Sequence, residues 1–136
     1  MRSFDELSQS IRDGYDRAVY SDHKDVIFSE VLLACALADR DTFGRFSARA
    51  VQDQLNQIIL DKGYNVSQFS YHLKAFCDEK RGNILEKIGD TGNFRYRFRE
   101  ALMEPFVIAQ SVQRKVIDED QLDKIIPQQI PDLFST

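Results

Sequence analysis

The segment that decides the fold covers residues 47–99 and reads SARAVQDQLNQIILDKGYNVSQFSYHLKAFCDEKRGNILEKIGDTGNFRYRFR. It begins with two stretches whose apolar side chains recur every three or four residues, which predicts two amphipathic helices. The first stretch contains Val51, Leu55, Ile58 and Ile59, and the second contains Phe69, Leu73, Phe76 and Cys77. The predicted N-caps are Ser47 and Ser67, and the predicted terminating glycines are Gly63, in a left-handed conformation, and Gly82. Two helices joined by so short a link predict a helix-turn-helix pair.

After Gly82 the apolar period changes to two, over residues 84–88 and 94–99. The Gly-Asp-Thr-Gly sequence at 89–92 is typical of a turn, so this stretch predicts a β-hairpin. Because strand side chains alternate between faces, the aromatic and basic residues of the second strand must separate. One face carries Phe94, Tyr96 and Phe98, and the other carries Arg95, Arg97 and Arg99. We expect the aromatic face to pack on the core and the arginine face to contact water.

Two further helices are expected before this segment. Over residues 4–20, helical spacing relates Phe4, Leu7, Ile11, Tyr15 and Val19, with Gly14 as a poor helix former among them. Residues 24–38 are apolar on most sides, with Ser21 or Asp22 as N-cap, which predicts a central buried helix. Residues 39–44 read as a polar turn, and Arg45-Phe46 as a very short strand. This order predicts an α+β fold, mainly α: a winged helix (helix-turn-helix plus β-hairpin wing) with flanking N- and C-terminal helices, in which residues 67–80 form the recognition helix.

The sequence after the hairpin is expected to be helical first and then extended. A helix is predicted through Leu102, Phe106, Ile108 and Val112, with Pro105 tolerated in its first turn and an end near Val116. Leu122, Ile125 and Ile126 suggest a short helix, and Pro127 and Pro131 an extended tail. We therefore divide the chain into a winged-helix domain with its N-terminal helix, residues 1–116, and a tail, residues 117–136.

Composition is that of a single globular domain, with 136 residues of which 43% are hydrophobic and 29% are charged. Cys35 and Cys77 lie in apolar helical patterns without zinc-site spacing, which favours reduced core thiols. No stretch has the roughly 20 apolar residues of a membrane span, and the N-terminus lacks the order of a signal peptide. We expect a cytoplasmic protein with no membrane partner.

The residue types that catalysis needs are sparse. The two histidines, His23 and His72, are not in a motif that pairs either with a nucleophile, and no His or Cys residues have metal-ligand spacing. His23 reads as a helix-start residue, His72 as a surface polar residue, and residues 118–120 (Asp-Glu-Asp) as a solvated acidic turn. We therefore expect no enzyme activity in this chain, no metal and no cofactor.

The charge distribution points to one surface. Residues 68–99 contain seven Lys and Arg against four Asp and Glu, whereas the whole chain has a net charge of -4. The residues proposed to contact DNA or a partner are Gln68, Tyr71, His72, Lys74, Lys87, Arg95, Arg97 and Arg99. Against DNA, Asp78 and Glu79 are expected near the end of the recognition helix, where they would repel phosphate. The arginines have a simpler reading too, in which they solvate the hairpin or pair with acidic residues of a neighbouring domain.

Two stretches carry a resemblance to a known family. They are FSEVLLACALADRDTFGRFSARAVQDQL at 28–55 and FSYHLKAFCDEKRGNILEKIGDTGNFRYRFREALMEPFVIAQSV at 69–112. Together they resemble the C-terminal winged-helix tail of bacterial AAA-type and STAND-type ATPases. The specific parts are ACALA, FCDEKRG, and FRYRF followed by Met-Glu-Pro-Phe. The chain itself has no G-x-x-x-x-G-K-[ST] loop, so the resemblance implies nucleotide chemistry in another part of a parent protein.

The sequence thus favours a non-catalytic interaction module, the C-terminal domain of a bacterial ATPase, that mediates protein or interdomain contacts. Its expected partner is the ATPase core of the parent protein or another protein. The alternative is a DNA-binding winged-helix regulator that uses the basic wing.

Overall fold

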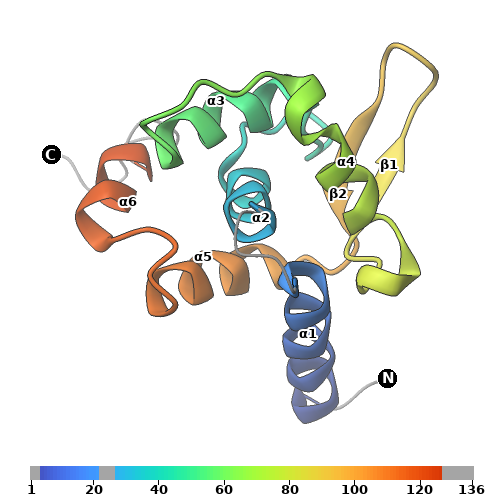
Figure 1. Ribbon diagram of the computed structural model, residues 1–136. Helices are drawn as coiled ribbons and strands as arrows, with labels where there is room; N and C mark the ends of the chain where they lie inside the picture. Colours follow the sequence, from blue (N-terminus) through green and yellow to red (C-terminus); the bar gives the residue numbers. More distant parts are fainter. Residues whose placement is uncertain (1–3, 22–26, 127–136) are drawn as a thin grey trace, which may run out of the picture.

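The computed structural model describes residues 4–21 and 27–126, which form six α-helices, one short 3-10 helix and one two-stranded sheet (Figure 1). In chain order the elements are α1 (Phe4–Val19), α2 (Phe28–Leu37), α3 (Ala48–Ile58), α4 (Val66–Phe76), η1 (Glu79–Arg81), β1 (Leu85–Ile88), β2 (Arg95–Phe98), α5 (Met103–Gln113) and α6 (Glu119–Ile125). The mainly helical α+β fold predicted from the sequence is confirmed. No helix among the described residues is long and apolar enough to cross a membrane.

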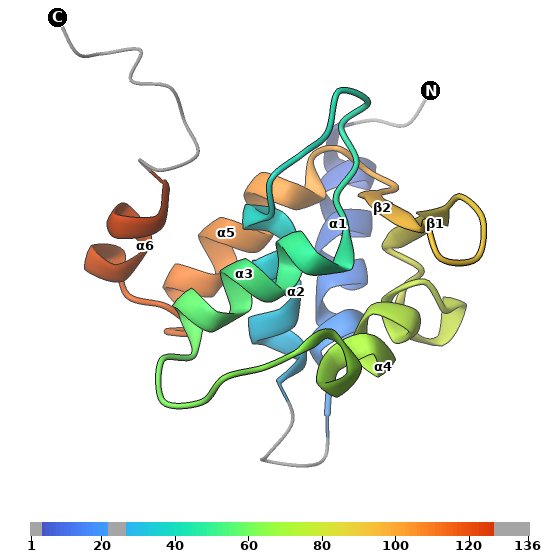
Figure 2. The ribbon, with the colours of Figure 1, turned by 90° about the horizontal axis from the view of Figure 1, so that it is seen from above.

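Helix α2 is the centre of the molecule, as predicted. Eight of its ten residues are buried, and α1, α3, α4 and α5 all pack against it (Figures 1 and 2). Its predicted start was wrong: the helix begins at Phe28, and Ile27 occupies the cap position without a side-chain cap. Ser21 therefore does not cap it, and Asp22, Lys24 and His23 lie outside the described residues. Packing of an apolar surface stabilises this helix without the predicted capping bond.

The link between α3 and α4 differs from the prediction. The Ser47 side chain accepts a hydrogen bond from Ala50 N, which confirms its role as the N-cap of α3. Helix α3 ends at Ile58, before Gly63, and Gly63 has no positive φ, so its predicted left-handed role was wrong. The side chain of Asn56 instead forms two hydrogen bonds with the backbone of Tyr64. Asn56 Nδ2 donates to the Tyr64 carbonyl oxygen at 3.0 Å, and Tyr64 N donates to Asn56 Oδ1 at 2.7 Å. This pairing holds the link close to α3.

The predicted N-cap of α4 was also wrong. Asn65, two residues before Ser67, accepts a bond from Gln68 N, and the Gln68 side chain accepts one from Asn65 N. This capping box satisfies two backbone donors at once, whereas a cap at Ser67 would satisfy one. Helix α4 therefore spans Val66–Phe76 and is shorter than the predicted recognition helix.

Gly82 ends the α4–η1 segment as predicted, with φ 86°. A Cβ at Gly82 would lie 2.9 Å from the carbonyl oxygen of Gly14 in α1. The two glycines therefore mark a close backbone crossing, and a Cβ at Gly14 would itself lie 3.2 Å from the side chains of Ile84 and Met103.

The hairpin has the predicted alternation. Strand β1 pairs antiparallel with β2, with Glu86 opposite Arg97 and Lys87 opposite Tyr96. Phe46 forms a separate antiparallel bridge to Tyr96, with both hydrogen bonds at 2.8–2.9 Å. This bridge confirms the very short strand predicted at Arg45-Phe46 and attaches the hairpin to the residues that precede α3.

The last two helices complete the core. Pro105 lies in the first turn of α5 as predicted, although α5 ends at Gln113, before Val116. The short predicted helix is confirmed as α6, which lies at one side of the molecule, near the ends of α3 and α5 (Figures 1 and 2). Asp118 is its N-cap, so residues 118–120 are the start of a helix rather than a solvated turn. The Gln121 side chain donates to two carbonyls at the end of α3, and the predicted extended tail, with Pro127 and Pro131, lies outside the described residues.

Candidate interaction surface

The outward face of the small sheet carries a row of guanidinium groups. Because Phe46 pairs with Tyr96 and both are buried, the neighbouring Arg45 lies beside Arg97 on the opposite, outward side. We call Arg45, Arg95, Arg97 and Arg99 the basic face. Sequence reasoning missed Arg45, although its position next to an apolar strand residue was a signal of the same alternation that placed the other three.

Lys87 does not belong to the basic face. It pairs with Tyr96 in the register, so it lies on the opposite side of the sheet from the arginines. Its ammonium group is 3.9 Å from the ring centroid of Phe94, a cation–π contact on that side. Grouping Lys87 with the arginines was therefore wrong, because the register between the strands, and not the composition of the hairpin, decides which residues share a face.

The guanidinium groups of the hairpin have partners within the chain. Arg97 Nε donates to Glu86 Oε2 at 2.8 Å, and this hydrogen bond holds the pKa of Glu86 below its ordinary value. Arg99 Nε donates to Asn83 Oδ1 at 3.0 Å, and Arg95 Nη1 donates to a neighbouring backbone carbonyl. The hairpin arginines are consequently oriented before any partner arrives.

An exposed phenylalanine lies beside the basic face. The Asp41 carboxylate accepts the backbone N–H groups of Phe43 and Arg45 at 2.8 and 3.0 Å, and the bond from Arg45 is the main reason that the pKa of Asp41 is lowered. This turn leaves Phe43 77% exposed, with its ring centroid 5.6 Å from the Arg45 guanidinium carbon. Phe43 is a second contact candidate that sequence reasoning missed.

The predicted contact residues of α4 divide into two groups. Tyr71 and Lys74 are exposed, Tyr71 to 67%. Gln68 is exposed too, but its side-chain oxygen is used in the capping box. His72 is half-buried, with its ring 4.7 Å from that of Phe28, and burial lowers its pKa, so it is not the surface residue predicted.

Helix α4 does not include the two acidic residues that were expected to weaken DNA binding. It ends at Phe76, and Asp78 and Glu79 belong to the following turn and η1. The Asp78 carboxylate caps η1 by accepting from Lys80 N at 2.9 Å. The exposed residues of α4 itself are Ser67, Gln68, Ser70, Tyr71 and Lys74, and none is acidic.

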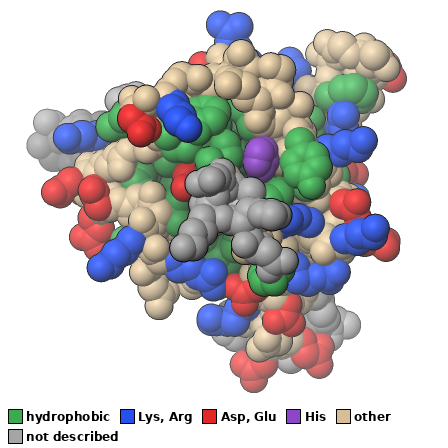
Figure 3. All heavy atoms as spheres, in the orientation of Figure 1, with side chains coloured by type: hydrophobic (Ala, Val, Ile, Leu, Met, Phe, Trp, Pro, Cys, Tyr) green, Lys and Arg blue, Asp and Glu red, His purple; other side chains and the backbone are tan. Residues whose placement is uncertain are grey.

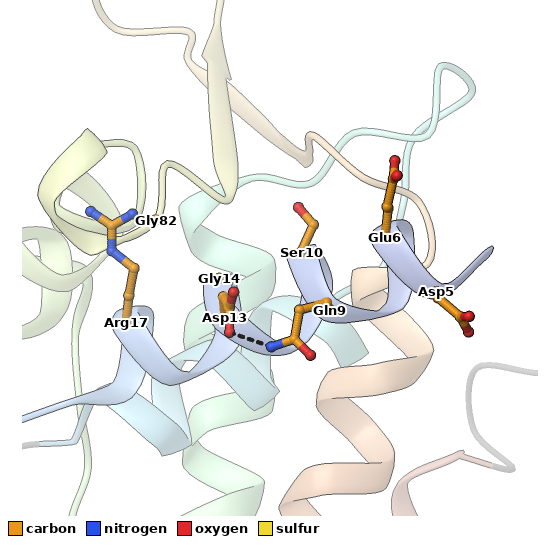
Figure 4. Close-up of a pocket in the computed structure, with 8 residues that line it drawn as sticks. All are labelled: Asp5, Glu6, Gln9, Ser10, Asp13, Gly14, Arg17 and Gly82. Carbon is orange, nitrogen blue, oxygen red and sulfur yellow. Dashed lines mark hydrogen bonds between the residues drawn. The ribbon is translucent and has the colours of Figure 1, made fainter. Parts of the chain in front are cut away.

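The remaining titratable groups form no reactive cluster in the described part of the chain. A surface hollow of about 580 Å³ runs along α1, and its carboxylates Asp5, Glu6 and Asp13 are spread along the helix (Figure 4). No group of three His, Cys, Asp or Glu residues among those described can hold a metal ion. Cys35 and Cys77 are free thiols whose pKa is raised by burial; Cys35 is fully buried, and Cys77 is half-buried at the end of α4.

Basic side chains gather at the side of the molecule where α4 and η1 lie, whereas acidic ones are prominent along α1 and near α6 (Figure 3). Comparisons with protein families, with curated proteins and with solved structures find no match to this chain.

Proposed function

We propose that the chain is a winged-helix module that binds another protein without catalysing a reaction. The observation that carries the fold assignment is the bridge between Phe46 and Tyr96, because it supplies the short first strand that a winged helix has between its first two helices. The order α2, Phe46, α3, α4, β1, β2 then corresponds to helix, strand, helix, helix and wing. In this assignment α4 is the recognition helix and the hairpin is the wing.

The basic face and Phe43 are the proposed docking surface. Arginine and aromatic side chains dominate the energetics of protein interfaces, because they combine large contact areas with directed hydrogen bonds. Here Arg97 is oriented by Glu86 and Arg99 by Asn83, so these two side chains lose little entropy on binding. The partner that fits them carries carboxylates, which accept paired hydrogen bonds from guanidinium groups.

The resemblance to ATPase C-terminal tails identifies the partner we favour, the ATPase core of a parent protein. The test compares the wild-type chain with the variant Arg95→Ala/Arg97→Ala/Arg99→Ala by calorimetric titration against the ATPase core encoded upstream of Met1. A matched control, Arg12→Ala/Lys62→Ala/Lys115→Ala, removes three cations outside the basic face. The first variant should bind more weakly and the control should not. Equal binding by all three proteins, or an upstream sequence without an ATPase core, would refute the proposal.

DNA binding is the second candidate, supported by the absence of acidic residues on the exposed surface of α4. If the hairpin arginines neutralise three phosphates, the same triple variant should make the log-log salt dependence of DNA affinity shallower by roughly 2.7. Titration of duplex DNA at several salt concentrations measures this slope. Absence of salt-dependent binding by the wild-type chain at low ionic strength would eliminate this candidate.

A further inference from the structure

A cleft outside the basic face lies between the end of α4 and η1. Its volume is about 260 Å³, and it is lined by Tyr71, Lys74, Ala75, Asp78, Lys80 and Arg81. Three of these six residues are cationic, and the exposed ring of Tyr71 contributes to its lining. Aromatic and cationic groups around one small concavity match a ligand that has both a flat ring and an anionic group.

Arg81 is the preorganised member of the cleft. Its Nη1 donates to the carbonyl oxygens of Ala18 and Tyr20, and its guanidinium carbon is 3.7 Å from the ring centroid of Phe28. These contacts hold the planar guanidinium in one position. Both hydrogen bonds use Nη1, and no described residue accepts one from Nε or Nη2, so these two groups can donate to an anion that enters the cleft.

The two lysines supply charge that the described part of the chain does not neutralise. Lys74 and Lys80 are exposed, and no described carboxylate forms an ion pair with either. The carboxylate of Asp78 lies in the lining, where it accepts the backbone N–H of Lys80. Three cations and one carboxylate give the lining a formal charge of +2. A phosphate monoester carries about −1.5 to −2 and therefore balances this charge better than a singly charged phosphodiester does.

We propose that this cleft binds a phosphate monoester attached to or near an aromatic ring. The phosphoryl oxygens accept from Arg81, Lys74 and Lys80, and the ring packs against Tyr71. This site is independent of the proposed docking role of the basic face, since none of its residues belongs to that face.

The experiment is an NMR titration of backbone amides in the full chain with inorganic phosphate, phenyl phosphate and AMP. Saturable shifts are expected at Lys74, Ala75, Lys80 and Arg81, with phenyl phosphate or AMP binding more tightly than inorganic phosphate. Lys74→Ala and Lys80→Ala should each weaken binding by up to about fivefold, as expected for exposed charge pairs. Lys62→Ala, which removes an exposed lysine elsewhere, should have no effect.

The three probes also identify the source of the monoester. Preference for phenyl phosphate favours a phosphorylated tyrosine, and preference for AMP favours a nucleotide. Tyr71→Ala should abolish either preference while leaving inorganic phosphate binding in place. The proposal is overturned if no monoester produces saturable shifts at these amides, or if Lys62→Ala weakens binding as much as Lys80→Ala.

Discussion

Replacement of Gly82 by alanine tests the close crossing between α1 and the turn after η1. Gly82 has φ 86°, and an added Cβ would lie 2.9 Å from the carbonyl oxygen and 3.2 Å from the Cα of Gly14. Both of these atoms belong to the backbone of α1, so no side-chain rotation can relieve the contact. Alanine at this position therefore has two costs, one conformational and one steric.

Gly92 provides the matched control, because its φ is 87° and a Cβ there would meet nothing within 4 Å. The left-handed conformation should cost alanine about 1–2 kcal/mol at either position. Overpacking adds roughly 1–3 kcal/mol at Gly82 alone. We expect Gly82→Ala to lower the free energy of unfolding by roughly 2–5 kcal/mol and Gly92→Ala by about 1–2 kcal/mol. The effect of alanine on the unfolded chain is similar in both variants and cancels in the comparison.

Urea unfolding followed by circular dichroism measures both values. A domain of this size should unfold in one transition. A difference of about 1–3 kcal/mol between the free energies of unfolding of the two variants corresponds to urea midpoints about 1 M apart, for an m-value of roughly 1–3 kcal/mol/M. Equal midpoints for the two variants would show that the turn and α1 are not in backbone contact. A larger loss for Gly92→Ala would contradict the placement of both glycines.

Three smaller tests concern the cap of α4, the ion pair of the hairpin and the thiol at the end of α4. Asn65→Ala should lower the free energy of unfolding by about 1 kcal/mol and Ser67→Ala by less, because Asn65 is the N-cap of α4. Equal urea midpoints for the two variants would contradict the assignment of Asn65 as the cap. Arg97→Ala should raise the pKa of Glu86, followed by NMR, toward its ordinary 4.5. Because the wild-type pKa is lowered, the stability that this pair contributes is present above pH 4.5 and is lost as the pH falls. An unchanged pKa of Glu86 in the variant would exclude the ion pair. Cys77 should react slowly with a thiol reagent at neutral pH without denaturant, because burial raises its pKa, whereas labelling as fast as that of a free thiol would contradict the packing of the α4 end.

Element types were largely predictable, because they depend on short-range periodicity. The three- and four-residue spacing identified α1 and α3, and the alternation in residues 94–99 identified β2 and separated its aromatic and arginine faces. Burial of α2 followed from its apolar composition. The ends of helices were less predictable, because several polar residues compete for each cap. Asn65 and not Ser67 caps α4, because only Asn65 has a Gln three residues later, Gln68, that completes the capping box.

By itself the sequence determined which segments are helices and strands, and that one side of the second strand is rich in arginine. Tertiary structure alone decided which residues share the candidate surfaces. Arg45 joins the basic face through the pairing of Phe46 with Tyr96, fifty residues away, and Lys87 is excluded from it by its register with the same tyrosine. The cleft beside Tyr71 likewise depends on Arg81 being held by carbonyls at the end of α1. Periodicity along the chain reports only the local face of one element, whereas these contacts form because packing brings distant segments together.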